Sequence, residues 1–172
     1  MFDLNYDSKR CSLEISEEPW LKDGVRLHHQ WASLVFAPVK RVDEVLGYVV
    51  VIQPKKDRKA KYKLPGGGRE PGETPLVTAI RELWGETGIK VLPGVVRYVN
   101  AEPRPGHWSI LFVADLTEQD VPWMNTDHPE NDGEIPRFFT VAEFSTLIVH
   151  DGFFEPHLNR LRRFSLLSQA GV

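Results

Sequence analysis

Glu82 and Glu86, two glutamates one helical turn apart, are the first candidates for a chemical role in this chain. They follow a glycine-rich turn within residues 63–89, KLPGGGREPGETPLVTAIRELWGETGI. Side chains four residues apart on a helix lie roughly 6 Å apart, so two carboxylates there repel unless a cation lies between them. Mg²⁺, with Mn²⁺ as a substitute, suits such oxygen ligands. The pattern therefore indicates metal-assisted attack on a pyrophosphate.

The helix that must position these acids is predicted over residues 75–87. Thr74 is typical of a cap and Pro75 of a first helical residue, while Gly88 suits the position just past the end. We expect the two glutamates on the face opposite the apolar one, towards solvent or a cleft. An isolated pair of this spacing is more typical of a solvated helix face, so the interpretation depends on the surrounding residues. The apolar face consists of Leu76, Val77, Ile80, Leu83 and Trp84.

Eight residues around the pair follow a longer pattern, namely Gly, five residues, Glu, seven residues, then Arg-Glu-apolar-x-Glu-Glu-x-Gly-apolar. This pattern is the Nudix box, and the chain therefore resembles the Nudix (MutT-like) hydrolases, which cleave nucleoside diphosphates linked to another moiety. The resemblance implies an α/β fold, an α/β/α sandwich with a mixed β-sheet and a loop-helix-loop catalytic motif. The matching residues are Gly67, Glu73, Arg81, Glu82, Leu83, Glu86, Gly88 and Ile89.

The resemblance also implies roles for individual residues. Glu82 and Glu86 correspond to metal ligands, and the carbonyl of Gly66 corresponds to a frequent backbone ligand. Glu73 and Arg81 correspond to an ion pair that braces the loop against the helix. The implied reaction is a Mg²⁺-dependent cleavage of the pyrophosphate bond, with water as the attacking group.

The chain departs from the family pattern at Gly85, where the first glutamate of the Glu-Glu pair is expected. Water or another acid such as Glu70 could take the place of that ligand, because Mg²⁺ usually retains several waters. Two functions therefore stay open. One is the hydrolase, which the retained acids of the box favour, and the other is a catalytically impaired Nudix-fold module that binds or senses a nucleotide.

A carboxylate that orients or deprotonates the attacking water is often supplied from outside the box. The acidic loop of residues 127–134 precedes the last predicted strand and is where we expect it. Glu130 is the first candidate and Glu134 the second, although a loop acid taken by itself is more typical of a surface carboxylate. Glu82 itself could also serve as the base.

Contacts with the substrate phosphates are expected from a basic segment ahead of the glycine turn. Residues 55–63 hold six Lys or Arg and one Asp, whereas the whole chain carries a net charge of −3. Such a patch attracts polyanions, although a solvated hairpin loop is an equal alternative for any single lysine. Lys61 and Lys63 directly precede the turn, in which the backbone of Gly67 and Gly68 is expected to approach a phosphate.

Recognition of a base is the weakest part of the pattern. Trp108, Trp123 and Phe112 could stack on a base, yet aromatic residues in strands belong more often to the core. Trp123 lies in a polar, proline-containing stretch and is the better candidate of the three.

The whole chain, residues 1–172, is expected to form one domain, since 172 residues suffice for a single well-buried core. Strands rich in β-branched and aromatic residues alternate with helices, which is typical of a mixed sheet covered by helices. The pattern predicts strands over 31–39, 46–53, 95–100, 107–116 and 135–140, a turn over 103–106, and helices over 141–149 and 156–169.

Composition narrows the classes of partner. No apolar run approaches the ~20 residues of a membrane span, and the first ten residues lack a signal pattern, so we expect a cytoplasmic protein. Cys11 is the only cysteine, so no intramolecular disulfide is expected. Acidity outside the basic segment argues against a general nucleic-acid binder; a capped or triphosphorylated RNA end stays open as a substrate, as does a homodimer. The six histidines lack the spacing of a zinc site.

Overall fold

Strand β1 (Trp31–Arg41) lies in the middle of a seven-stranded mixed sheet in the computed structural model, which describes residues 18–54, 59–129 and 131–167. It pairs in parallel with β5 (His107–Ala114) and antiparallel with β2 (Glu44–Ile52). The order of the main strands is β4-β5-β1-β2-β7, where β4 is Val96–Arg104 and β7 is Ile135–Thr140. Two short strands, β3 (Gly66–Gly68) and β6 (Leu116–Thr117), also pair with β1.

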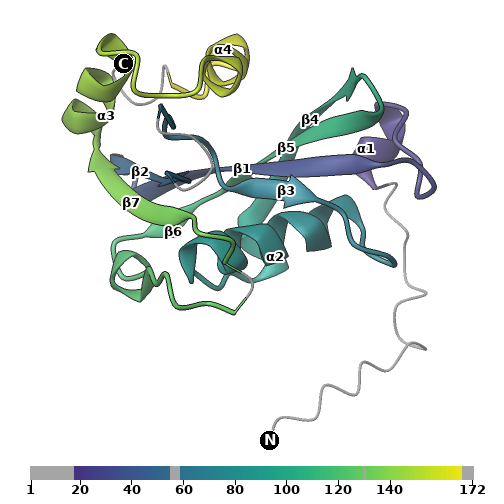
Figure 1. Ribbon diagram of the computed structural model, residues 1–172, viewed down its shortest axis with the longest axis horizontal. Helices are drawn as coiled ribbons and strands as arrows, with labels where there is room; N and C mark the ends of the chain where they lie inside the picture. Colours follow the sequence, from purple (N-terminus) through teal and green to yellow (C-terminus); the bar gives the residue numbers. More distant parts are fainter. Residues whose placement is uncertain (1–17, 55–58, 130, 168–172) are drawn as a thin grey trace, which may run out of the picture.

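Helices cover both faces of this sheet. Helix α2 (Pro75–Thr87) lies on one face, and α3 (Val141–Val149) and α4 (Glu155–Arg163) lie on the other, as Figure 1 shows. The expected α/β/α arrangement with a mixed sheet is therefore confirmed. Three short elements complete the order: α1 (Pro19–Lys22) and the 3₁₀ turns η1 (Pro93–Val95) and η2 (Val121–Trp123).

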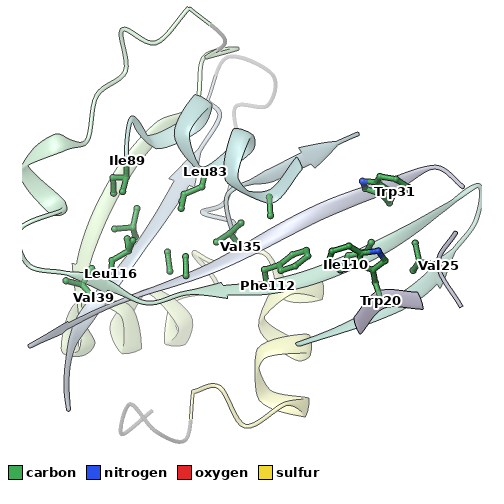
Figure 2. Packing of buried hydrophobic residues seen from close by; sticks show 14 residues of the cluster. Trp20, Val25, Trp31, Val35, Val39, Leu83, Ile89, Ile110, Phe112 and Leu116 are labelled. Carbon is green, nitrogen blue, oxygen red and sulfur yellow. The ribbon is translucent and has the colours of Figure 1, made fainter. Parts of the chain in front are cut away.

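Alternation along β1 divides the core into two clusters, because successive side chains of a strand point to opposite faces. Val35 and Val39 pack on the α2 side, where Figure 2 shows Leu83 and Ile89 lying over the sheet. Phe36 packs on the other side with residues of α3 and α4. Buried side chains therefore pack on both faces of the sheet, and the loops at its edges are attached to this packed core.

Phe112 belongs to this core and is 1% exposed. The hypothesis that its ring stacks on a base is therefore wrong, because β5 turns this side chain towards α2 and α1, where it makes an edge contact with Trp20.

The sequence signals for α2 are confirmed at both ends. The side chain of Thr74 accepts a hydrogen bond from the Val77 amide, and Gly88 ends the helix in the left-handed conformation, φ 77°. The predicted apolar face is rotated, however. Val77 is 48% exposed, whereas the polar Thr78 is fully buried, because its hydroxyl oxygen accepts a hydrogen bond from Trp31 Nε1.

Several element boundaries also differ from the prediction, most of all those of β4 and α4. Strand β4 runs to Arg104 instead of ending near residue 100, because its pairing with β5 continues to the Arg104–His107 pair, and the predicted turn over 103–106 is correspondingly shorter. Helix α4 begins one residue earlier than predicted and ends at Arg163 instead of residue 169; Ser165 then takes a positive φ of 53°. Within the described ranges, no helix has the length and apolar character needed to cross a bilayer.

Candidate active site

The glycine turn lies directly on helix α2. A Cβ atom at Gly67 would lie 2.5 Å from Glu82 Oε1, and one at Gly66 would collide with the carbonyl oxygen of Ser33 on β1. Side chains at these two positions would therefore push the loop away from both the helix and the sheet. The glycines allow the backbone to approach the carboxylates, while its expected approach to a substrate phosphate stays a prediction.

Glu86 is held in the interior and not on the solvent side of α2. Its residue is 6% exposed, its Oε2 accepts a hydrogen bond from the Gly66 amide at 2.8 Å, and its Oε1 lies 3.7 Å from Lys63 Nζ. Burial raises the pKa of Glu86 to about 8, although Lys63 and the Gly66 amide act in the opposite direction. Of the two expected positions, solvent or a cleft, the solvated one is therefore wrong, and the buried charge of this carboxylate is incompletely compensated.

Glu134 joins the same site from the loop before β7. It is 5% exposed, and its Oε1 lies 4.0 Å from Lys63 Nζ, so the lysine ammonium is within 4 Å of both Glu86 and Glu134. Asn131 fastens this loop, because its side-chain amide donates to the carbonyls of Glu134 at 3.0 Å and Glu86 at 3.5 Å. Of the two candidate bases, the structure brings Glu134 to the site, while Glu130 lies outside the described residues.

Glu82 lies one turn before Glu86. Its Oε1 accepts a hydrogen bond from Arg81 Nη1 at 2.8 Å. Burial raises its pKa, Arg81 opposes this change, and the charges of Glu73 and Glu134 add to it. The charges of Glu82 and Glu134 also raise the pKa of Glu86. The three carboxylates therefore lie close enough to repel one another.

The other two charged residues of the box, Glu73 and Arg81, form an ion pair between the loop and the helix. Arg81 Nε donates to Glu73 Oε1 at 2.6 Å, and its Nη2 donates to the Gly68 carbonyl at 2.8 Å. The Glu70 amide donates to Glu73 Oε2 at 2.9 Å, and the Thr78 hydroxyl donates to the same oxygen at 2.8 Å. This is the loop-to-helix ion pair that the family resemblance implies. The side chain of Glu70, the alternative ligand, is on an exposed residue.

The donor set suits a hard divalent cation with few protein ligands. Among the residues that the structure describes, no group of three or more His, Cys, Asp or Glu is placed to hold a metal ion. Mg²⁺ does not require such a group, because it keeps several waters and uses one or two carboxylates plus substrate phosphates. Glu82 and Glu86 supply such carboxylates, and burial raises the pKa of each, which a nearby cation would reverse. The residues present therefore fit the ion.

The other predicted contact residues lie elsewhere. Lys61 Nζ is 2.5 Å from Asp151 Oδ1, at the end of α3. The Trp108 ring stacks on His29 and packs against the core cluster, close to Gly24. Trp123 is 73% exposed and borders a cavity past the end of α2, beside Lys90. None of these three side chains has a recorded contact with the carboxylates, and residues 55–58 of the basic segment lie outside the described residues.

One contact of the glycine loop was not foreseen from the sequence. His157 Nδ1 accepts a hydrogen bond from the Leu64 amide at 3.1 Å, which places α4 against the start of the loop. The two residues are 93 positions apart, and an isolated histidine carries no pattern that would predict the contact.

Known proteins share both the sequence and the fold. Residues 29–161 match the family model of the NUDIX domain. Over 120 residues the chain is 32% identical to an ADP-ribose pyrophosphatase of Methanocaldococcus jannaschii, a match that covers 67% of this chain and 69% of that protein. A match of 43 residues is 46% identical to an RNA pyrophosphohydrolase of Roseobacter denitrificans, and it covers 25% of this chain and only 27% of that protein.

Solved structures agree at the level of the fold. A hydrolase of the NUDIX family from Clostridium perfringens superposes with a TM-score of 0.56 at 16% identity, covering 82% of this chain and 99% of that one. A MutT/nudix family protein from Enterococcus faecalis gives a TM-score of 0.51 at 15% identity, covering 67% and 45%. Since the family match extends over more than half of the residues and includes the glycine turn and α2, this chain belongs to the Nudix family.

Proposed function

We propose that this protein is a divalent-cation-dependent hydrolase that cleaves the pyrophosphate bond of a nucleoside diphosphate linked to another moiety. One observation carries the proposal: Lys63 lies within 4.0 Å of both Glu86 and Glu134, and Glu86 also accepts a hydrogen bond from the Gly66 amide. A buried site that holds more negative charge than its own residues compensate is suited to a cation and its anionic substrate.

Each residue has a definable task in this reaction. The cation would be held by Glu82, Glu86 and the Gly66 carbonyl. It would neutralise the negative charge that builds up on the phosphoryl oxygens. Glu134 is the candidate that orients or deprotonates the attacking water. The ammonium of Lys63, which reaches both carboxylates across almost 4 Å, is placed to contact a phosphate oxygen.

The lack of a carboxylate at Gly85 is a weaker argument against hydrolysis because Glu134 supplies another carboxylate. Gly85 is buried on α2 and contributes no carboxylate, but Glu134 adds a third carboxylate to the site from another element. The competing function, a module that binds nucleotides without cleaving them, is favoured only by Gly85. We therefore propose the hydrolase, with Mg²⁺ as the ion and Mn²⁺ as a substitute.

The relatives indicate which substrates to assay first. The longer match is to an ADP-ribose pyrophosphatase, so ADP-ribose and nucleotide sugars come first. The short match to an RNA pyrophosphohydrolase makes a triphosphorylated or capped RNA end the second choice. Nucleoside triphosphates and dinucleoside polyphosphates complete the panel.

The test is to assay this panel with Mg²⁺ and with Mn²⁺, using wild-type protein, Glu86→Gln and the control Glu118→Gln. Glu118 is an exposed acid paired with Arg41, so its neutralisation should leave turnover unchanged. The proposal predicts cleavage of at least one substrate, lost in Glu86→Gln. If nothing is cleaved while a nucleotide raises the melting temperature, the protein is a binding module.

A further inference from the structure

A second charged cavity lies on the face of the sheet opposite α2. It has a volume of about 270 Å³ and is enclosed by β1, the β4–β5 hairpin and the beginning of α4. Leu34 and Phe154 contribute apolar walls. Among the residues that the structure describes, no Asp or Glu lines the cavity. Its polar lining comes from Arg104, His107, Ser109, His157 and Arg160.

Within the described part of the chain, the arginines around this cavity share one acid, Glu102. Glu102 lies 3.0 Å from Arg104, 2.6 Å from Arg163 and 3.8 Å from Arg160. One carboxylate therefore faces three guanidinium groups. Arg160 is 1% exposed and is fixed in place, because it donates to the Ser109 hydroxyl at 2.7 Å and to the Asn100 carbonyl at 3.1 Å. The region keeps an excess of positive charge on a rigid framework.

His157 adds a hydrogen-bond donor to the cavity. Because its Nδ1 accepts from the Leu64 amide, the proton of the neutral ring is on Nε2. Burial lowers the pKa of His157 to about 4, and Lys63, Arg160 and Arg104 lower it further. At neutral pH the ring is therefore uncharged, with one N–H available, and no recorded bond in the described part of the chain uses Nε2.

The cavity lies next to the glycine turn that also contacts the candidate active site. Leu34, which lines the cavity, is paired with Gly66 across the β1–β3 ladder. The charge of Lys63 acts on both sides, since it lowers the pKa of Glu86 and that of His157. The turn of residues 64–66 therefore lies between the two sites, because its Leu64 amide donates to His157 and its Gly66 amide donates to Glu86.

We propose that this cavity is a metal-free subsite for an oxyanion carried by the part of the substrate that lies beyond the cleaved bond. Arginine, a neutral histidine with a free N–H and an excess of positive charge all favour an acceptor-rich anion. A phosphate group or a carboxylate has this chemistry. As a substrate subsite the inference rests on the proposed hydrolase function, but binding of the anion itself can be measured without turnover.

The experiment is a titration of the full chain with inorganic phosphate in the presence of a chelator, followed by the ¹H–¹⁵N signals of the His157 ring. Sodium chloride at equal ionic strength is the control for screening, and acetate tests a carboxylate as the occupant. Phosphate should shift the Nε2 signal saturably. The Arg104→Gln variant, which changes a half-exposed side chain of the hairpin, should weaken this binding at least fivefold.

The matched control is Arg97→Gln. Arg97 is an exposed arginine of the same strand that does not line the cavity, so its loss should leave phosphate binding unchanged. A response to acetate alone would identify a carboxylate as the occupant. The proposal is overturned if neither anion shifts the His157 signals, or if Arg104→Gln binds as tightly as the wild type.

Failure of this inference can be told from failure of the proposed function. Glu86→Gln should lose turnover yet keep the phosphate-dependent shift of His157, because Glu86 does not line the cavity. Turnover that survives in Glu86→Gln would contradict the assignment of the active site and leave the phosphate titration as a separate result.

Discussion

Two glutamates of the same box, Glu73 and Glu86, experience opposite electrostatic environments. Burial alone would raise the pKa of Glu73, but hydrogen bonds from Arg81, the Glu70 amide and Thr78 outweigh it, so the pKa lies below its ordinary value. For Glu86, burial outweighs the Gly66 amide and Lys63, and the pKa rises to about 8. The difference separates an acid whose charge is balanced within the motif from one whose buried charge is incompletely compensated.

The two positive charges near the motif, Arg81 and Lys63, differ in how closely they contact the acids. Arg81 contacts Glu73 at 2.6 Å and Glu82 at 2.8 Å, so its charge is used within the motif. Lys63 must serve both Glu86 and Glu134 from 3.7 and 4.0 Å. Buried charges lacking close partners are costly to a fold, and such residues are candidates for functional sites.

The largest expected effect is on turnover in Glu86→Gln. We expect kcat/KM to fall by at least about 100-fold, a loss typical for removal of a group that acts on the reacting atoms. The free energy of unfolding in chelator should not fall, because glutamine still accepts the Gly66 hydrogen bond and brings no charge into the interior. Denaturant unfolding beside the activity assay checks both, and a large loss of stability would contradict the comparison.

The reverse result is expected for Glu73→Gln. Neutralising the partner of Arg81 should lower the free energy of unfolding by about 1.5 kcal/mol, the scale of a hydrogen bond to a charged group. Denaturant melts of Glu73→Gln, Glu86→Gln and the surface control Glu118→Gln in chelator provide the measurement. Equal stability of the first two variants would show that the two acids do not differ in this way.

Much of this arrangement could be predicted from local signals. The ends of α2 followed from Thr74 and Gly88, and five strands followed from their β-branched and aromatic runs. Burial of Glu86 was missed because the predicted apolar face included Val77 and Trp84, which lie opposite Glu86 on the helix. The observed buried face is rotated towards Leu83, the neighbour of Glu86 three residues earlier, and the turn of residues 64–68 covers that side by pairing with β1.

Long-range contacts account for the rest. Glu134 and Lys63 meet only because β7 and the segment before the turn both lie beside β2. The contact of His157 with Leu64 depends likewise on how α4 packs over the sheet. Propensity and spacing report neighbours along the chain, and such tertiary contacts leave no mark in them.

A smaller effect is expected in Lys63→Met. Without the ammonium, Glu86 and Glu134 lose their facing charge, so the metal-free protein should lose about 1 kcal/mol of stability and gain more from added Mg²⁺ than the wild type does. Lys61→Met is the matched control, because Lys61 pairs with Asp151 instead. Thermal melts with chelator and with Mg²⁺ measure both quantities; identical responses of the two lysine variants would be inconsistent with the assigned role of Lys63.

The smallest expected effect is the pH dependence of the Glu73→Gln deficit. Because the folded-state pKa of Glu73 is lowered from 4.5, the unfolded chain binds the proton first as the pH falls. The stability contributed by Glu73 is therefore complete above about pH 4.5 and is lost as the pH falls through the lowered folded-state pKa. Melts of wild type and Glu73→Gln between neutral and acidic pH should converge at the acid end. A difference that stays constant with pH would exclude an ionic origin.

The central claim is that Glu86, unlike Glu73, requires a divalent cation, and Mn²⁺ binding followed by electron paramagnetic resonance tests it most directly. Wild type and Glu73→Gln should bind Mn²⁺ competitively with Mg²⁺, while Glu86→Gln should bind it at least about tenfold more weakly because a carboxylate ligand is removed. Equal Mn²⁺ affinity in wild type and Glu86→Gln would contradict the account.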